Sequence, residues 1–188
     1  MILGLGHINI VVEDINKASL YYKSLLNASP VQRFNNFRNS GFSKSAGFMD
    51  NFEDVDVSIE FLQVGDTDVF IELMEYHTPR STSNRFDKKT NMIGGVGHIC
   101  LKVSNIDDEF SRIKEHHDIR MISKSNDYKP FKISDIEASD FFFYEKEKEL
   151  DKEAKNEVVN IVSNTRYFYF IDLYGIQWEF EEGHSDIG

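Results

Sequence analysis

Hydrophobic and polar residues follow the same order twice along the chain. Residues 5–12 alternate as in a β-strand, and residues 14–27 then place apolar side chains at helical spacing, with Asp14 as the expected N-cap. Residues 96–103 and 106–117 repeat this strand and this amphipathic helix. Because both stretches open on Gly-His and break at polar residues before the helix, we expect an internal duplication.

Each expected helix is followed by residues that alternate as strands do. Residues 55–76 alternate around a turn at 65–67, and residues 166–182 alternate around a turn at 173–175. Both stretches predict β-hairpins. The simplest fold class that fits is α+β, built from two βαβββ modules.

The duplication divides the chain into two modules of unequal length. We expect the first module over residues 1–80, a linker over 81–94 and the second module over 95–184. The second module carries an acidic insertion at about 127–164, in which Glu and Lys alternate. A solvated helix or loop is the favoured interpretation. The alternative is a lid in which residues 141–143, all Phe, cover the mouth of a pocket.

Composition narrows the classes of function. The 188 residues include 16 Phe and 8 Tyr, which favours sheets and aromatic-lined cavities over a helical bundle. A net charge of −11 would repel a phosphate backbone, so nucleic acid is not an expected partner. The one cysteine argues against a disulfide framework and against a zinc site built from cysteines. The first residues lack the basic start of a signal peptide, and no apolar run approaches about 20 residues, so we expect a cytoplasmic protein with no membrane partner.

Each copy supplies one histidine and one glutamate from equivalent places. His7 and His98 lie on the first strand of their copies, and Glu72 and Glu179 lie on the last. Two imidazoles and two carboxylates suit one divalent ion such as Ni, Co, Zn, Mn or Fe. A glutamate on the apolar face of a sheet is costly without such a cation. Any one of these residues alone would be read as structural, but four at equivalent points of a duplication predict a metal site.

Alternation also predicts the side chains that line this site. Every second residue of a strand shares a face, so residues two or four positions from a ligand lie on its side of the sheet. Trp178 alternates to the other face and is expected to pack in the core. The expected pocket residues are Asn9, Val11, Phe70, Met74, Cys100, Lys102 and Gln177.

Four stretches of the sequence resemble the vicinal oxygen chelate superfamily, which includes glyoxalases, bleomycin resistance proteins and dioxygenases. They are GHINIVVEDINKASLYYKSLL, IELMEY, GHICLKVSNID and DLYGIQWEF. The last departs from the Asp-Pro-Asp-Gly common in the family, since Leu173 and Tyr174 replace the middle pair. The resemblance implies paired βαβββ modules whose curved mixed sheets surround a metal, as in glyoxalase and dihydroxybiphenyl dioxygenase. It also places the four predicted ligands on the family's ligand positions.

A His-Glu-His-Glu set is most similar to bacterial-type glyoxalase I. The resemblance implies a metal-dependent isomerase or lyase, in which the metal polarises a carbonyl of a small oxygen-rich substrate and stabilises an enediolate. The catalytic carboxylate that moves the proton would be Glu179 or Glu72. Val11 and Tyr76 stand where that enzyme carries the Arg and Asn that hold glutathione, which argues against a glutathione-linked substrate.

Three alternative functions remain open at this level. An acyl-CoA epimerase is disfavoured by the acidic net charge, and a non-haem iron dioxygenase by the fourth protein ligand. A non-catalytic small-molecule binding or resistance protein would use an aromatic pocket without turnover. The expected partners are a small-molecule substrate and a second copy of the chain in a homodimer. The modules would pair either within one chain or across the dimer.

Overall fold

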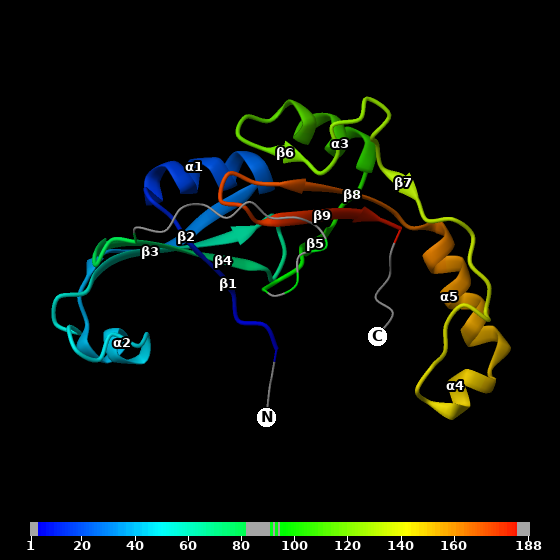
Figure 1. Ribbon diagram of the computed structural model, residues 1–188, viewed down its shortest axis with the longest axis horizontal. Helices are drawn as coiled ribbons and strands as arrows, with labels where there is room; N and C mark the ends of the chain where they lie inside the picture. The colour runs from blue at the N-terminus through cyan, green and yellow to red at the C-terminus, as the bar shows by residue number, and fades with distance from the viewer. Residues whose placement is uncertain (1–3, 82–90, 92, 94, 184–188) are drawn as a thin grey trace. The chain divides into compact units, whose positions relative to one another are not determined.

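The chain forms two compact units, over residues 1–84 and 85–188, each built on its own β-sheet (Figure 1). The computed structural model describes residues 4–81, 91, 93 and 95–183. The linker predicted over 81–94 lies almost wholly outside the described residues, so its bounds stay a prediction. Within the described residues, no helix combines the length and the hydropathy that a membrane crossing requires.

The first unit is a βαβββ module with one additional short helix. Its four strands are ordered β1-β4-β3-β2, with β1 parallel to β4 and the other neighbours antiparallel. The hairpin predicted around residues 65–67 is present as β3 and β4. The elements are β1 (Ile8–Val11), α1 (Ile15–Leu26), β2 (Ala28–Phe37), α2 (Ser40–Ser45), β3 (Asp56–Val64) and β4 (Phe70–Thr78).

Helix α1 covers one face of this sheet. The Asp14 carboxylate accepts the N–H groups of Asn16 and Lys17 at 3.1 and 3.0 Å, which fixes the start of the helix at the predicted cap. The helix packs on β3 and β4, and Ile71 and Leu73 of β4 are fully buried. The alternate residues of β4, which include Glu72, therefore lie on the face away from the helix.

The second unit repeats this plan and adds an insertion. Its sheet is ordered β5-β9-β8-β6, with β7 also paired to β8, and β5 is parallel to β9. The hairpin predicted around residues 173–175 is present as β8 and β9. The elements are β5 (Ile99–Lys102), α3 (Ile106–Glu115), β6 (Arg120–Met121), β7 (Phe131–Lys132), α4 (Lys146–Leu150), α5 (Lys152–Asn164), β8 (Arg166–Ile171) and β9 (Gln177–Glu182).

Two short strands, β6 and β7, take the place of the single second strand that the duplication predicts. They pair with opposite ends of β8 and leave a gap between them, in which the Ile122 N–H, just after β6, still donates to the carbonyl of Tyr169 at 3.2 Å. The Tyr128 hydroxyl fills this gap, since it accepts the N–H of Tyr169 at 2.7 Å and donates to the carbonyl of Tyr169 at 3.3 Å. A side chain thus replaces part of the hydrogen bonding that a continuous strand would supply.

The insertion expected at about 127–164 begins within the sheet, because Tyr128 and β7 bond to β8. Its later part forms α4 and α5, which extend away from the sheet of the second unit beside β7 (Figure 1). Helix α4 has no buried side chain. The Lys155 ammonium of α5 ties the preceding loop together, since it donates to the carbonyls of Ala138 and Phe141 and to Glu149 Oε1 at 3.0, 3.1 and 2.7 Å. These three contacts join residues of the insertion to one another. The side chains of α4 are charged apart from Leu150 and none is buried, which agrees with a solvent-exposed helix.

Candidate metal centre

The first unit brings the predicted ligands His7 and Glu72 into contact. His7 lies immediately before β1, and Glu72 lies on β4. The parallel register places Asn9 beside Glu72. As a result, His7 Nε2 lies 3.1 Å from Glu72 Oε2, and the Asn9 amide donates to the same oxygen at 2.9 Å.

The second unit repeats this arrangement with His98 and Glu179. His98 lies immediately before β5, and the parallel pairing of β5 with β9 places Cys100 beside Glu179. His98 Nε2 lies 2.8 Å from Glu179 Oε2. Each unit therefore presents one half of the predicted ligand set, in the same geometry.

An aromatic ring supports the imidazole in both units. In each hairpin, an aromatic residue pairs with the glutamate on the neighbouring strand. Phe61 pairs with Glu72, and Tyr169 pairs with Glu179. The Phe61 ring contacts His7 edge-on at 5.8 Å between centroids, and the Tyr169 ring contacts His98 at 5.2 Å. Sequence alternation within single strands did not identify these two residues, because their position depends on the register between strands.

A second pair of glutamates repeats between the units and has a structural role. Glu75 and Glu182 each follow the ligand glutamate by three residues. Glu75 Oε2 accepts the first N–H of α1, from Ile15, at 2.9 Å, and Glu182 Oε1 accepts the first N–H of α3, from Ile106, at 3.3 Å. A carboxylate at a helix N-terminus is favourable, so these contacts tie each helix to the strand that carries the candidate ligand.

The distances within each His–Glu pair fit ligands of one metal ion. Two neighbouring ligands of an octahedral ion with bonds of about 2.1 Å lie about 3 Å apart, close to the observed 2.8 and 3.1 Å. Glu72 and Glu179 are only 7% and 8% exposed, and such buried carboxylates call for a nearby cation. Imidazole and carboxylate together suit borderline divalent ions. The residues present therefore fit the metal that the sequence predicts.

The carboxylates also change the acidity of their neighbours. Desolvation raises the pKa of the Cys100 thiol to about 12, and the charges of Glu179 and Glu181 add to this rise. Desolvation also raises the pKa of the Tyr169 phenol, with a further contribution from the charge of Glu179 and a hydrogen bond to it. Burial and the charge of Glu72 raise the pKa of Tyr76. Both glutamates thus create a negative field on their side of the sheet.

The predicted pocket residues lie on the ligand faces of the strands, as alternation requires. The register adds two adjacent pairs, Val11 with Met74 and Lys102 with Glu181. Trp178 is fully buried and donates from Nε1 to Asp172 Oδ2 at 2.9 Å, so its assignment to the core is confirmed. Whether the pocket residues touch a substrate stays a prediction. The pocket residues are Asn9, Val11, Phe70, Met74, Cys100, Lys102 and Gln177.

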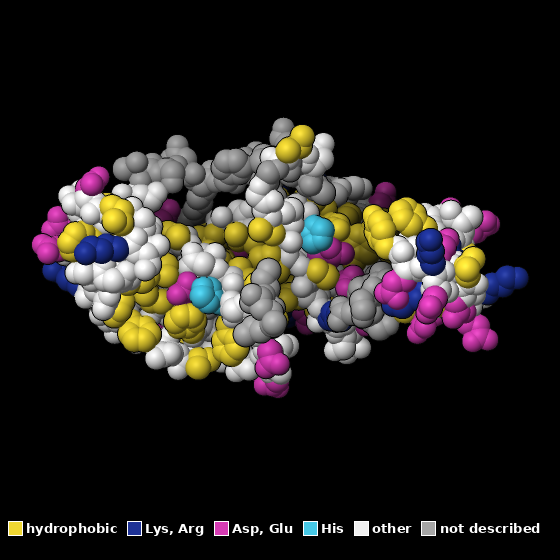
Figure 2. Space-filling view, turned by 90° about the horizontal axis from the view of Figure 1, so that it is seen from below, with side chains coloured by type: hydrophobic (Ala, Val, Ile, Leu, Met, Phe, Trp, Pro, Cys, Tyr) yellow, Lys and Arg dark blue, Asp and Glu magenta, His cyan; other side chains and the backbone are white. Residues whose placement is uncertain are grey.

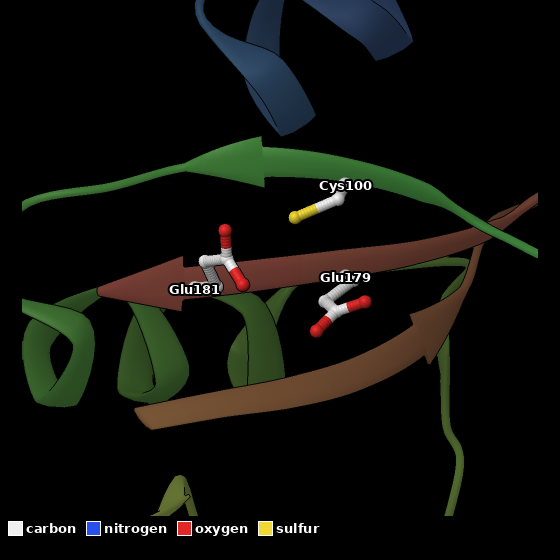
Figure 3. A group of neighbouring side chains, drawn as sticks. All are labelled: Cys100, Glu179 and Glu181. Carbon is white, nitrogen blue, oxygen red and sulfur yellow. The ribbon is translucent and has the colours of Figure 1, made fainter. Parts of the chain in front are cut away.

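Glu181 lies two residues after Glu179, on the same face of β9, where alternation places it. Cys100 of β5 and Glu179 and Glu181 of β9 project from one side of the sheet (Figure 3). One donor atom from each of the three lies within 4.8 Å of the other two. On the molecular surface, histidine side chains lie next to acidic side chains on the face that Figure 2 presents.

Comparison with known proteins agrees with this geometry. A glyoxalase family protein from Bacillus cereus matches with a TM-score of 0.65 and 17% identity over 98% of this chain and 97% of that protein. The fosfomycin resistance protein FosX from Listeria monocytogenes, solved with Mn(II) and sulfate, matches with a TM-score of 0.52 and 16% identity over 100% of this chain and 96% of that protein. No curated protein matches the sequence.

Membership of a family is shown by comparison with families of sequences. The family described as the glyoxalase/bleomycin resistance protein/dioxygenase superfamily matches residues 6–132, which is more than half of the 188 residues. This span includes the whole of the first unit's sheet and the start of the second unit. The chain therefore belongs to the glyoxalase/bleomycin resistance protein/dioxygenase superfamily.

Proposed function

We propose that this protein is a metal-dependent isomerase or lyase that acts on a small, oxygen-rich substrate. One observation carries the proposal: each unit pairs a histidine Nε2 with a glutamate Oε2 at equivalent positions, at 3.1 and 2.8 Å. Together, His7, Glu72, His98 and Glu179 would ligate one divalent ion, Ni, Co, Zn, Mn or Fe. The two units that complete this set would come from one chain or from two chains of a homodimer.

The chain's own residues would divide the work of binding and proton transfer. A bound divalent ion supplies Lewis-acid polarisation of a substrate carbonyl. Glu179 or Glu72 then removes the proton from the carbon next to that carbonyl and returns it to another atom of the substrate. The Asn9 amide keeps Glu72 Oε2 directed toward His7, while the Tyr169 hydroxyl does the same for Glu179. These contacts favour one fixed orientation of each carboxylate.

The substrate class is inferred from Val11 and Tyr76, the two positions at which bacterial-type glyoxalase I holds glutathione. Val11 is 50% exposed and apolar, and the Tyr76 hydroxyl donates to the sulfur of Met74. Neither residue offers the cation or amide that a glutathione carboxylate or peptide group would need. We therefore favour a small substrate recognised mainly by its oxygen atoms, over a glutathione conjugate.

The proposal is tested by following the C–H proton directly. The full chain is purified without added metal and reconstituted with each ion in turn. Exchange of substrate protons with deuterated water is then followed by NMR for a panel of 2-oxo aldehydes, their thiol adducts and hydroxy ketones. Fosfomycin, an epoxide without a carbonyl, joins the panel because of the fold shared with FosX, and its conversion is followed by the loss of its own NMR signals.

We expect metal-dependent exchange with at least one compound, lost in Glu179→Gln and kept in the control His117→Ala, whose side chain is exposed in α3's following loop. Bound metal without exchange on any carbonyl compound would contradict the proposed reaction. Equal exchange in the Glu179→Gln variant would contradict the role of that carboxylate.

A further inference from the structure

We propose that Cys100 is a sulfur donor of the metal centre to which Glu179 belongs, with Glu181 as an adjacent carboxylate donor. This inference rests on the proposed function, because Glu179 is one of its four ligands. It adds a consequence for metal choice: a thiolate donor favours thiophilic ions such as Zn(II), Co(II) and Cd(II) over Mn(II) and Mg(II).

The geometry brings the sulfur within reach of an ion at Glu179. Cys100 and Glu179 are direct partners in the parallel register of β5 and β9, so their side chains leave neighbouring points of one face. Donor atoms of Cys100, Glu179 and Glu181 all lie within 4.8 Å of one another (Figure 3). Metal–sulfur bonds of about 2.3 Å and metal–oxygen bonds of about 2.1 Å span up to about 4.4 Å between opposite donors, so an ion would contact all three after side-chain shifts of a few tenths of an ångström at most.

The first unit lacks this arrangement, which makes the second unit distinctive. In the first unit, Asn9 pairs with Glu72 as Cys100 pairs with Glu179, so Asn9 is the counterpart of Cys100. Met74 follows Glu72 by two residues as Glu181 follows Glu179, so Met74 is the counterpart of Glu181. Neither counterpart is an anionic donor. The thiol and the additional carboxylate are thus specific to one half of the duplicated site and are not required by the fold.

A buried amide provides an independent sign that a ligand occupies this face. Gln177 is only 1% exposed, and neither Nε2 nor Oε1 has a hydrogen-bond partner among the described residues. Gln177 lies two residues before Glu179 on β9, so both side chains are on the same face. Because Ile99 pairs with Trp178, the residues before them, His98 and Gln177, are also neighbours. Buried polar groups are nearly always satisfied, so this amide is placed to bind a group held at the metal.

The charges around the cluster also favour a cation. Glu179 and Glu181 contribute two negative charges. The one lysine of β5, Lys102, pairs with Glu181 and contributes one positive charge. The local balance is negative before the thiol is ionised. On binding, the thiol proton passes to solvent as the metal–sulfur bond forms, so each ion bound releases one proton.

The experiment uses the single cysteine of the chain. Metal-free, reduced full-length protein is titrated with Co(II) alone, and absorbance is recorded in the near ultraviolet, where cobalt–thiolate charge transfer absorbs. Because the chain has no other cysteine, any such band belongs to Cys100. We expect the band to saturate with bound cobalt, to vanish in Cys100→Ser, and to weaken in Glu181→Gln.

Alkylation provides a second measurement that does not depend on spectra. Cys100 is exposed, so a thiol reagent reaches it in the metal-free protein, although slowly, because its pKa is raised and the thiolate is the reactive form. The rates are therefore compared at one fixed alkaline pH. At Zn(II) about 100 times its dissociation constant, we expect alkylation to slow about a hundredfold, since only the metal-free fraction reacts. Cys100→Ser should lose about 10–100-fold in Zn(II) affinity and little in Mn(II) affinity.

The outcomes separate this inference from the proposed function. Bound cobalt with no thiolate band, and unprotected Cys100, would overturn the inference while leaving the four-ligand centre intact. A thiolate band that survives in His7→Ala with full cobalt content would instead support Cys100 ligation and contradict the four-ligand centre. Circular dichroism of each variant confirms that a lost band does not reflect unfolding.

Discussion

The carboxylate of Asp172 holds together the turn between β8 and β9, the strand that carries Glu179. Its removal should lower the free energy of unfolding of the second unit. Asp172 is 5% exposed and directly follows β8. Its Oδ1 accepts the N–H groups of Tyr174 and Ile176, and its Oδ2 accepts Trp178 Nε1–H, each at 2.9 Å. Substitution Asp172→Ala removes all three bonds at once.

The size of the effect follows from these contacts. A hydrogen bond to a charged acceptor contributes about 1.5–3 kcal/mol, and a buried donor left unsatisfied costs about 1–3 kcal/mol. The indole N–H of Trp178 is fully buried and would stay unsatisfied, whereas the two backbone groups are half-buried and regain water. We therefore expect Asp172→Ala to lower the free energy of unfolding by about 3–5 kcal/mol. Asp172→Asn should lose less, because its Oδ1 still serves the turn.

Urea denaturation followed by circular dichroism measures this loss. Fluorescence adds a local probe, since Trp178 is the chain's one tryptophan. In a Trp178→Phe background the indole donor is absent, so Asp172→Ala should cost about 1–3 kcal/mol less there. Equal losses in both backgrounds, or a loss below about 1 kcal/mol in the native background, would refute the reasoning.

Three further predictions concern other parts of the molecule. Asn9→Ala should lower metal affinity about 10–100-fold, because Glu72 loses the amide that orients it; calorimetry measures this. Arg38 holds the pKa of Asp56 below its ordinary 3.8, so their pair stabilises the fold fully above about pH 5 and loses this contribution as the pH falls through the lowered pKa. Arg38→Met should therefore flatten the acid side of the stability curve. Lys155→Met should raise hydrogen exchange within the insertion and leave metal content unchanged.

Each of these predictions has a contradicting outcome. Unchanged metal affinity in Asn9→Ala would show that the amide does not orient the ligand. An acid stability slope that is the same with and without Arg38 would show that this pair is not linked to folding. Metal lost from Lys155→Met would show that the insertion supports the site and is not an independent segment.

The sequence was most informative where the pattern was local. The two Gly-His strands and the two hairpins were predicted, because alternation and turn residues mark them directly. The Asp14 cap is confirmed by two hydrogen bonds from the first turn of α1. The placement of Trp178 in the core followed from alternation alone.

Features that depend on pairing between distant strands could not be predicted in the same way. The support of His7 by Phe61 and of His98 by Tyr169 requires the register of each hairpin. The bonds of the Tyr128 hydroxyl to the backbone of Tyr169, between β6 and β7, also require the placement of a distant strand. Neither effect leaves a periodic signal in the sequence.

The central proposal is that His7, Glu72, His98 and Glu179 ligate one metal ion, and metal content tests it most directly. Elemental analysis would be made of the reconstituted protein and of His7→Ala, His98→Ala and the control His117→Ala, all verified as folded. We expect about one ion per chain in the native protein and the control, and loss of most metal in both site variants. Full metal content in either His7→Ala or His98→Ala would contradict the shared centre.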